Sequence, residues 1–232
     1  MINLIHSQLF LLTFTIGTYV VAVWLYRRTK LMLLHPLLTS LLVIIVGIKS
    51  AGIPYPEYAG ATKIIDFLLG VSVVALGYLL YEQMIHMKGN ITAMLTSVLV
   101  GSVVGIVSVI LIARALGADP RVVSSLEPKS ITTAIAVTVC QHSGGIPALT
   151  AIVVIVVGIF GAVVGPVILR ILRIESKLAK GLALGAAAHA VGTARAMELG
   201  AVEGAISGLA IGLMGVMTAI MVPVIEVIMK YL

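Results

Sequence analysis

The segment that decides the fold reads SSLEPKSITTA and occupies residues 124–134. A glutamate, a proline, a lysine and several hydroxyl side chains stand here between long apolar runs. A charged side chain at membrane depth costs about 2.5 to 3.5 kcal/mol on insertion scales, so such a residue usually has a function. A helix interrupted at that depth exposes backbone groups that must line a cavity or be buried in protein. The segment therefore predicts a functional break in a membrane helix.

Composition places the chain in a membrane. Its 232 residues are 60% hydrophobic and only 10% charged, whereas soluble domains carry about 25% charged residues. The sequence therefore predicts an all-α polytopic membrane protein in contact with the lipid bilayer. The net charge of +6 falls in short clusters without the aromatic partners of a nucleic-acid surface, so no nucleic acid is expected. The single Cys140 excludes an internal disulfide and a multi-cysteine metal site, and we expect no cofactor.

Seven apolar stretches have about the length that crosses a bilayer. They occur at residues 8–26, 31–50, 64–82, 91–113, 147–169, 178–194 and 205–229. The first ends in Arg27-Arg28, which indicates a spanning helix and not a cleaved signal peptide. Because the connecting loops are short, we expect one integral membrane domain over residues 1–232 with about seven to eight transmembrane helices.

The charge distribution bears on how residues 124–142 meet the membrane. If they cross fully, with the basic cluster at Arg27-Arg28 inside, the basic residues of 170–180 fall outside, against the positive-inside rule. A re-entrant half-span moves those residues inside. The count thus favours seven crossings plus one re-entrant element, and residues 178–194 are the alternative broken segment.

A weak internal repeat is typical of a transporter. Residues 69–76 (LGVSVVAL) resemble residues 126–133 (LEPKSITT), and each copy precedes a helix with small residues. Many secondary transporters are built from repeats whose broken helices meet near the midplane. Chance similarity between apolar sequences of low complexity is the alternative.

The break carries the first candidate binding residues. Ser124-x-x-Glu127 matches a helix capping box, and Pro128 is typical of a first helical turn. We therefore expect a short helix to start here, with free N–H groups and a positive dipole end that suit a carboxylate. Four further candidate residues follow within two turns, namely Lys129, Ser130, Thr132 and Thr133. The alternative is a capped interfacial turn whose charges face water.

A second candidate site follows downstream. His189 and Thr193 lie four residues apart and share a helix face, and an intramembrane histidine can carry a proton. Arg195 points elsewhere in a regular helix, but two neighbouring glycines are expected to loosen the helix and let it turn inward, with Glu198 at i+3 as counter-ion. The alternative is a snorkelling arginine paired with Glu198 beside a buried histidine.

Two further candidates are Glu203 and Ser207, which recur at helical spacing beside a row of glycines. Glycines at this spacing let helix backbones approach closely. The two polar side chains face the cavity or cap the helix, and the spacing leaves both open. Asp66 and Glu226, near the ends of apolar stretches, are expected at the membrane interface.

An enzyme is not expected. Ser207 lacks the leading glycine of a rhomboid-type Gly-x-Ser-Gly, and no aspartate stands where it would orient His189. The sequence has no Walker loop, no His-Glu-x-x-His and no paired-aspartate site.

Three motifs together resemble the LrgB/CidB family of bacterial inner-membrane proteins. They are EPKSITTAIA at residues 127–136, AHAVGTARA at 188–196 and GAISGLA at 204–210. The resemblance covers nearly the whole chain and carries the family pattern onto ten residues, which are Glu127, Pro128, Lys129, Ser130, Thr132, Thr133, His189, Gly192, Thr193 and Arg195. The chain departs from the family where Ala134 replaces a common proline and where residues 70–76 lack a Pro and a Thr.

The resemblance implies two functions. The family is tied to control of murein hydrolase activity and autolysis beside a small holin-like LrgA/CidA partner. A plastid relative transports glycolate and glycerate, bacterial pairs are linked to pyruvate, and the fold is thought related to antiporters with crossing broken helices. We therefore expect an inner-membrane transporter, or its substrate-binding half, for small monocarboxylates such as pyruvate or glycolate. Lys129 or Arg195 would bind the anion, and His189 or Glu203 would carry a proton. The alternative is a non-transporting, antiholin-like regulator of a holin-like pore, and a homo-oligomer suits either.

Overall fold

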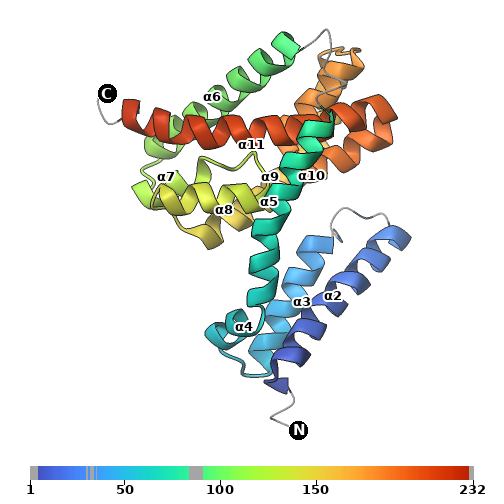
Figure 1. Ribbon diagram of the computed structural model, residues 1–232, viewed down its shortest axis with the longest axis vertical. Coiled ribbons are helices and arrows are strands. Elements are labelled where there is room, and N and C mark those ends of the chain that lie inside the picture. The colour runs from blue at the N-terminus through green and yellow to red at the C-terminus, as the bar shows by residue number, and fades with distance from the viewer. Residues whose placement is uncertain (1–4, 30, 32–33, 35, 84–90, 230–232) are drawn as a thin grey trace. The chain divides into compact units, whose positions relative to one another are not determined.

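The computed structural model describes residues 5–29, 31, 34, 36–83 and 91–229 (Figure 1). Within these residues the structure is helical and contains no strand. Its helices are α2 (Gln8–Thr29), α3 (Pro36–Ser50), α4 (Tyr55–Ala61), α5 (Lys63–Gln83), α6 (Ile91–Ala115), α7 (Pro120–Leu126), α8 (Thr133–His142), α9 (Pro147–Ile171), α10 (Lys177–Leu199) and α11 (Ala201–Met229). The all-α class predicted from composition is confirmed.

Four described helices are long and apolar enough to cross a membrane, namely α2, α6, α9 and α11, and α3 is a shorter apolar helix. The helices α6 and α9 contain 25 residues each, which is about 37 Å of helix. That length exceeds the roughly 30 Å hydrocarbon core of a bilayer. The chain is therefore a multi-pass membrane protein.

Contacts between Cα atoms divide the chain into two compact units, residues 1–71 and 72–232. In the first unit Leu11, Ile53 and Ala61 form a small apolar cluster. The hydroxyl groups of Thr15 and Tyr58 lie 2.9 Å apart and join α2 to α4. The unit boundary falls within α5, and the expectation of a single domain over residues 1–232 stays a prediction.

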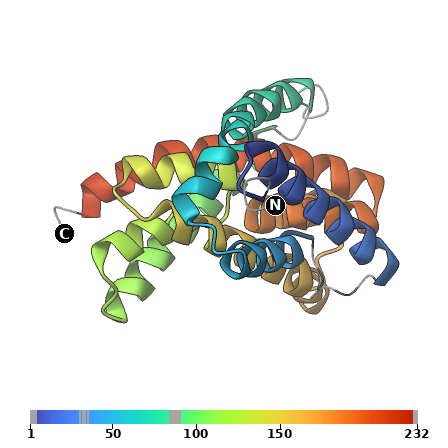
Figure 2. The same cartoon turned by 90° about the horizontal axis from the view of Figure 1, so that it is seen from below.

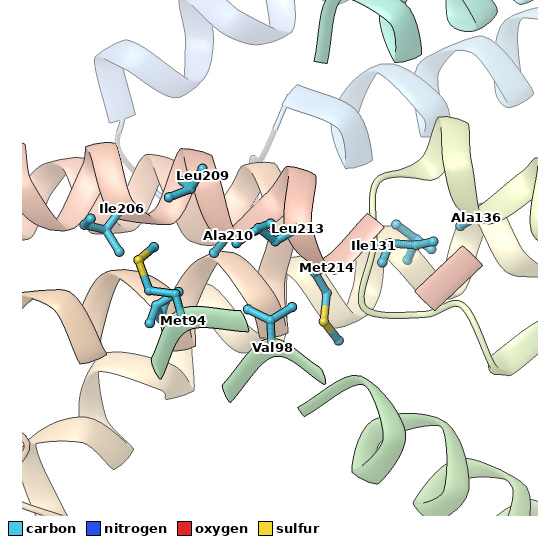
Figure 3. Packing of buried hydrophobic residues seen from close by; sticks show 11 residues of the cluster. Met94, Val98, Ile131, Ala136, Ile206, Leu209, Ala210, Leu213 and Met214 are labelled. Atoms are coloured by element: carbon cyan, nitrogen blue, oxygen red, sulfur yellow. The ribbon is translucent and has the colours of Figure 1, made fainter. Parts of the chain in front are cut away.

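The second unit is organised around α11, which packs most extensively against α10 and also contacts α6 (Figure 1 and Figure 2). Its largest apolar cluster draws residues from five helices and from the segment before α8 (Figure 3): Met94, Val98, Ile131, Ala136, Val154, Leu182, Ile206, Leu209, Ala210, Leu213 and Met214. The hydroxyls of Ser102 and Thr218, 3.2 Å apart, add a buried polar contact between α6 and α11. These contacts place α6, α10 and the segment before α8 around one core.

Glycines let α10 approach the backbone of α11. A Cβ atom on Gly181 would lie 2.6 Å from the carbonyl oxygen of Glu203, and one on Gly185 would overlap that of Ser207. A stretch of α10 therefore touches α11 backbone to backbone, as small residues allow between membrane helices.

The predicted break between residues 124 and 142 is present, but its helix starts elsewhere. Asp119 accepts a hydrogen bond from the backbone N–H of Arg121 at 2.8 Å, and Pro120 occupies the first turn of α7. An aspartate N-cap followed by proline is a strong start signal, so Ser124 lies inside α7. The prediction of a helix start at Pro128 is therefore wrong. Instead α7 ends at Leu126 because Pro128 has no N–H to continue it, and α8 begins at Thr133.

A second interruption lies within α10. His189 has φ 42° and ψ −132°, which is not helical. A Cβ atom on Gly192 would overlap the carbonyl oxygen of Leu184, eight residues earlier, whereas a straight helix separates such residues by about 12 Å. The chain therefore folds back at His189, and the two halves of α10 pack on each other. The sequence left open which segment is broken, and the structure interrupts both.

The internal repeat does not extend to the break. Residues 69–76 lie inside the continuous helix α5, whereas residues 127–132 are non-helical. The first copy lacks the proline that ends α7, so nothing in its backbone forces an interruption.

We predict that Gly185→Ala destabilises the protein, because its methyl group would meet the backbone of α11 and overpacking costs about 1–3 kcal/mol. Thermal unfolding in detergent measures the change. The matched control is Gly208→Ala, because a Cβ atom at Gly208 meets nothing within 4 Å. Equal unfolding temperatures for the two variants would contradict the close approach of α10 and α11.

Candidate functional site

A cavity of about 550 Å³ lies between α6, α10 and the break before α8. Its polar side chains are Ser97 of α6 and Lys129 and Ser130 of the break. The other lining residues are small or apolar: Ala93, Val98, Gly101, Val104, Gly105, Leu178, Ala179, Leu182, Ala183, Ala186, Ala187 and Met214. The cavity thus offers one cation and two hydroxyls in apolar surroundings.

Lys129 carries the charge of this cavity. Its side chain is half-buried, and Nζ donates a hydrogen bond to Ser130 Oγ at 3.1 Å. The ion pairs among the described residues are His6–Glu57 and Arg195–Glu198, so none of these residues supplies a carboxylate to Lys129. An anion that binds in the cavity would stabilise the positive charge of Lys129.

The break is anchored on both sides of Lys129. Ile131 is 1% exposed and packs into the apolar cluster with Val98 and Met214 (Figure 3). On the other side, Ser125 Oγ accepts a hydrogen bond from the N–H of Ile146 at 2.7 Å, and Thr150 Oγ1 donates to the Ser125 carbonyl at 2.8 Å. Lys129 therefore projects from a backbone whose position is set by packing and hydrogen bonds.

The first turn of α8 follows directly. Thr132 is its N-cap residue, and the side chain makes no capping hydrogen bond. Thr132 Oγ1 is buried and has no partner among the described residues, while Thr133 is half-buried and Pro128 is buried. The expected helix N-terminus with free N–H groups thus exists beside Ser130, but it starts at Thr133.

His189 lies in the core and not in this cavity. Its side chain is buried, Nε2 lies 2.9 Å from the carbonyl oxygen of Val154, and the ring packs on Gly158. A Cβ atom at Gly158 would overlap the imidazole. The side chain of His189 therefore attaches the turn within α10 to α9.

Thr193 and Ser207 meet, with their hydroxyl oxygens 2.7 Å apart and both side chains buried. Glu203 is buried in the first turn of α11, where its carboxylate packs against Gly200. None of the three lines the cavity of Lys129. The hydroxyl of Ser207 is thus paired with that of Thr193, and the imidazole of His189 with the carbonyl oxygen of Val154.

Arg195 lies away from Lys129. Its guanidinium is exposed and donates to the carboxylate of Glu198, three residues later. Gly192 does not loosen the helix as expected, because it is buried against the other half of α10. The pairing with Glu198 was foreseen, whereas the structure does not bring Arg195 to the cavity.

Glu226 belongs to a site that the sequence analysis missed. It lines a second cavity of about 350 Å³ together with Glu127 and Arg114. The spacing carried a signal, because Glu226 lies four residues after the buried Val222 and eight after the buried Thr218. It thus shares their helix face and is half-buried, and its expected position at the membrane interface stays a prediction.

Comparisons with known proteins agree with the motifs. A family described as LrgB-like matches residues 15–228. The "Uncharacterized protein YxaC" of Bacillus subtilis (strain 168) is 39% identical over 186 residues, which cover 80% of this chain and 81% of that protein. The "Antiholin-like protein LrgB" of Bacillus mycoides (strain KBAB4) is 34% identical over 214 residues, which cover 92% of this chain and 91% of that protein. No solved structure matches. The resemblance inferred from the three motifs is confirmed.

We predict that His189→Val destabilises the protein more than His189→Gly. A β-branched residue at positive φ is strained, whereas glycine adopts this backbone freely. Both variants lose the hydrogen bond to Val154, and valine fills more of the space left by the imidazole, so a lower unfolding temperature for valine in detergent reports the backbone strain. In a continuous helix valine would be the better residue, and that order of stability would contradict the break at His189.

Proposed function

Because this chain belongs to the LrgB-like family, we propose that it is a carrier, or the substrate-binding half of one, for small monocarboxylates such as pyruvate or glycolate. In this proposal it resides in the cytoplasmic (inner) membrane, with seven to eight crossings and with α7–α8 as a re-entrant element. A small holin-like protein of the LrgA/CidA type, or a second copy of the chain, is the proposed partner.

The single observation that supports the proposal is the cation Lys129 in an apolar cavity without a carboxylate partner among the described residues. An anion in the cavity would pair with its ammonium group and accept hydrogen bonds from the hydroxyls of Ser97 and Ser130. Charge-assisted hydrogen bonds contribute about 1.5–3 kcal/mol each. A monocarboxylate is favoured over a dianion because the cavity offers one positive charge.

The size of the cavity supports a small substrate. Pockets for small molecules measure roughly 300–1,000 Å³, and this one is about 550 Å³. Gly101 and Gly105 of α6 line it, and a Cβ atom on either would meet nothing within 4 Å. These glycines therefore leave space for a ligand and are not required for tight packing.

We predict that Lys129→Gln removes transport of labelled pyruvate and glycolate into proteoliposomes. Loss of one charge-assisted hydrogen bond weakens binding by about 10- to 100-fold, so uptake at low substrate concentration falls to the level of protein-free vesicles. Lys177→Gln, at an exposed lysine in the first turn of α10, is the matched control and retains uptake. Wild-type protein that neither binds nor moves either compound would overturn the proposal.

We also predict that Gly101→Leu blocks uptake without unfolding the protein. The new side chain occupies open cavity space, and leucine is a better helix former than glycine, so the unfolding temperature holds or rises. Gly17→Leu is the control, because a Cβ atom there also meets nothing within 4 Å and the residue lies in the first unit, outside the cavity of Lys129. Normal uptake by Gly101→Leu would show that the substrate does not occupy this cavity.

A second candidate function is a non-transporting, antiholin-like regulator that controls autolysis through a holin-like pore. The observation that favours it is the name of several relatives, "Antiholin-like protein LrgB". Control of lysis by Lys129→Gln separates the two functions. A pure regulator keeps lysis control in this variant and shows no uptake even as wild type, whereas a carrier loses uptake on substitution.

A further inference from the structure

A second cavity lies at the opposite half of α6. The cavity of Lys129 touches α6 at residues 93–105, whereas the second one touches it at Ile110, Arg114 and the following turn to Ala118. The two cavities have no lining residue in common. Glu127 lines the second and Lys129 lines the first, so the buried Pro128 stands between them.

Glu127 is an unusual occupant of this position. It is 5% exposed, and its Oε2 atom has no hydrogen-bond partner among the described residues. A buried carboxylate oxygen without a donor is costly, and a proton or a bound cation relieves that cost. The orphaned oxygen belongs to a side chain that lines the cavity, so a ligand can reach the site.

A second carboxyl group completes the site. Glu226 of α11 lines the same cavity of about 350 Å³ as Glu127. Two carboxylates in one small cavity repel each other, and one proton bound between them relieves that repulsion. The pair comes from two separate elements, the break after α7 and helix α11, so its proton also links those elements.

The surroundings define which charges act on the pair. Arg114, exposed at the end of α6, is the one cationic side chain among the described residues that line this cavity. His142 of α8 lines an adjoining cavity that Glu226 and Ser143 also line. The remaining polar groups of the lining are the hydroxyls of Ser124 and Ser143. The cavity is thus lined by the exposed Arg114, the half-buried Glu226 and the buried Glu127, which offers a path for a proton from water.

We infer that the Glu127–Glu226 pair is the proton-binding site that couples transport to a pH gradient. This inference rests on the proposed function and names the coupling residues in place of His189 and Glu203. In each cycle the deprotonated pair accepts one H⁺ from H₃O⁺ on the Arg114 side, forming one carboxyl O–H bond and leaving H₂O, and Lys129 binds one monocarboxylate. The same proton leaves as H₃O⁺ when the pair is exposed to the other side. One proton and one monoanion cross together, so the cycle moves no net charge.

The position of Pro128 gives this coupling a physical route. Glu127 and Lys129 are two residues apart on one non-helical segment. A movement of this segment on protonation of the carboxyl pair therefore also moves the anion-binding ammonium group of Lys129. Protonation removes the repulsion between the break and α11 and favours a closer contact between them. The alternative in which the proton rides on His189 lacks this link, since His189 contacts α9 and lines neither cavity.

The test measures labelled pyruvate in proteoliposomes of wild type, Glu226→Gln, Glu226→Asp and the control Asp66→Asn, an exposed carboxylate in α5. An inward gradient of one pH unit drives about tenfold accumulation by a one-proton carrier. We expect this accumulation in wild type and Asp66→Asn, independent of an imposed membrane potential. We expect its loss in Glu226→Gln and only a partial return in Glu226→Asp, which keeps a carboxyl group but has a shorter reach. An internal pH dye reports proton entry with pyruvate in the same vesicles.

The outcomes separate the two proposals. Exchange of labelled for unlabelled pyruvate at equal pH on both sides tests the carrier itself, and its absence in wild type overturns the proposed function. If wild type exchanges pyruvate and follows the pH gradient, but Glu226→Gln follows it equally well, the carboxyl pair is not the coupling site. If Glu226→Gln fails to fold, Glu226→Asp decides, since a shorter carboxyl that leaves the pH response and dye signal unaltered in rate and extent overturns the pair geometry.

Discussion

The close approach of α10 to α11 is the constraint on which the rest of the second unit depends. Gly181 and Gly185 leave no room for a side chain against the backbone of α11. This contact fixes the first half of α10 as one wall of the cavity, with α6 as another. Because both walls are small and apolar, the polar groups that a ligand meets come chiefly from the segment between α7 and α8. The same packing continues past His189, where the second half of α10 folds back and brings Thr193 to Ser207.

The break places two opposite charges on either side of one proline. Within three residues the chain turns Glu127 toward one cavity and Lys129 toward another, with buried Pro128 between them. A regular helix would place two such residues on different faces as well, but it would also satisfy its own backbone groups. Here the interruption leaves the N-terminus of α8 and Thr132 Oγ1 without partners among the described residues. An anion pocket and a carboxyl pair are thus parts of one non-helical segment.

Features of this arrangement that depend on composition and on short motifs could be predicted from the sequence. Composition predicts the all-helical, multi-pass class. The region around Pro128 predicts an interruption, because no helix continues through proline without losing a hydrogen bond. The spacing of His189 and Thr193 predicts a shared helix face. Both side chains are buried, but the break at His189 leaves one bonded to Val154 of α9 and the other to Ser207 of α11. The pair of Arg195 with Glu198 follows from its i+3 spacing. The family follows from three motifs and is shown by the comparisons.

The remaining features depend on tertiary contacts that no short window of sequence contains. Both the capping box at Ser124 and the pair Asp119-Pro120 are signals for the start of one helix. The helix starts at the stronger signal, Asp119-Pro120, and not at Ser124. Gly192 was expected to loosen α10, whereas its role is to let the folded halves touch, which requires knowing that the chain reverses at His189. By sequence, Glu226 near a helix end resembles an interfacial residue. Its position next to the break depends on the tertiary packing of α11. The internal repeat also ends at the break, since α5 has no proline at the corresponding position.

The most direct test of the central claim is equilibrium binding of labelled pyruvate or glycolate to purified protein, followed by scintillation proximity in detergent. The account predicts saturable binding of one ligand per chain to the wild type, displaced by unlabelled monocarboxylates and lost in Lys129→Gln, while Lys177→Gln binds normally. Equal binding by wild type and a folded Lys129→Gln protein would contradict the assignment of the anion site to the cavity beside the broken helix.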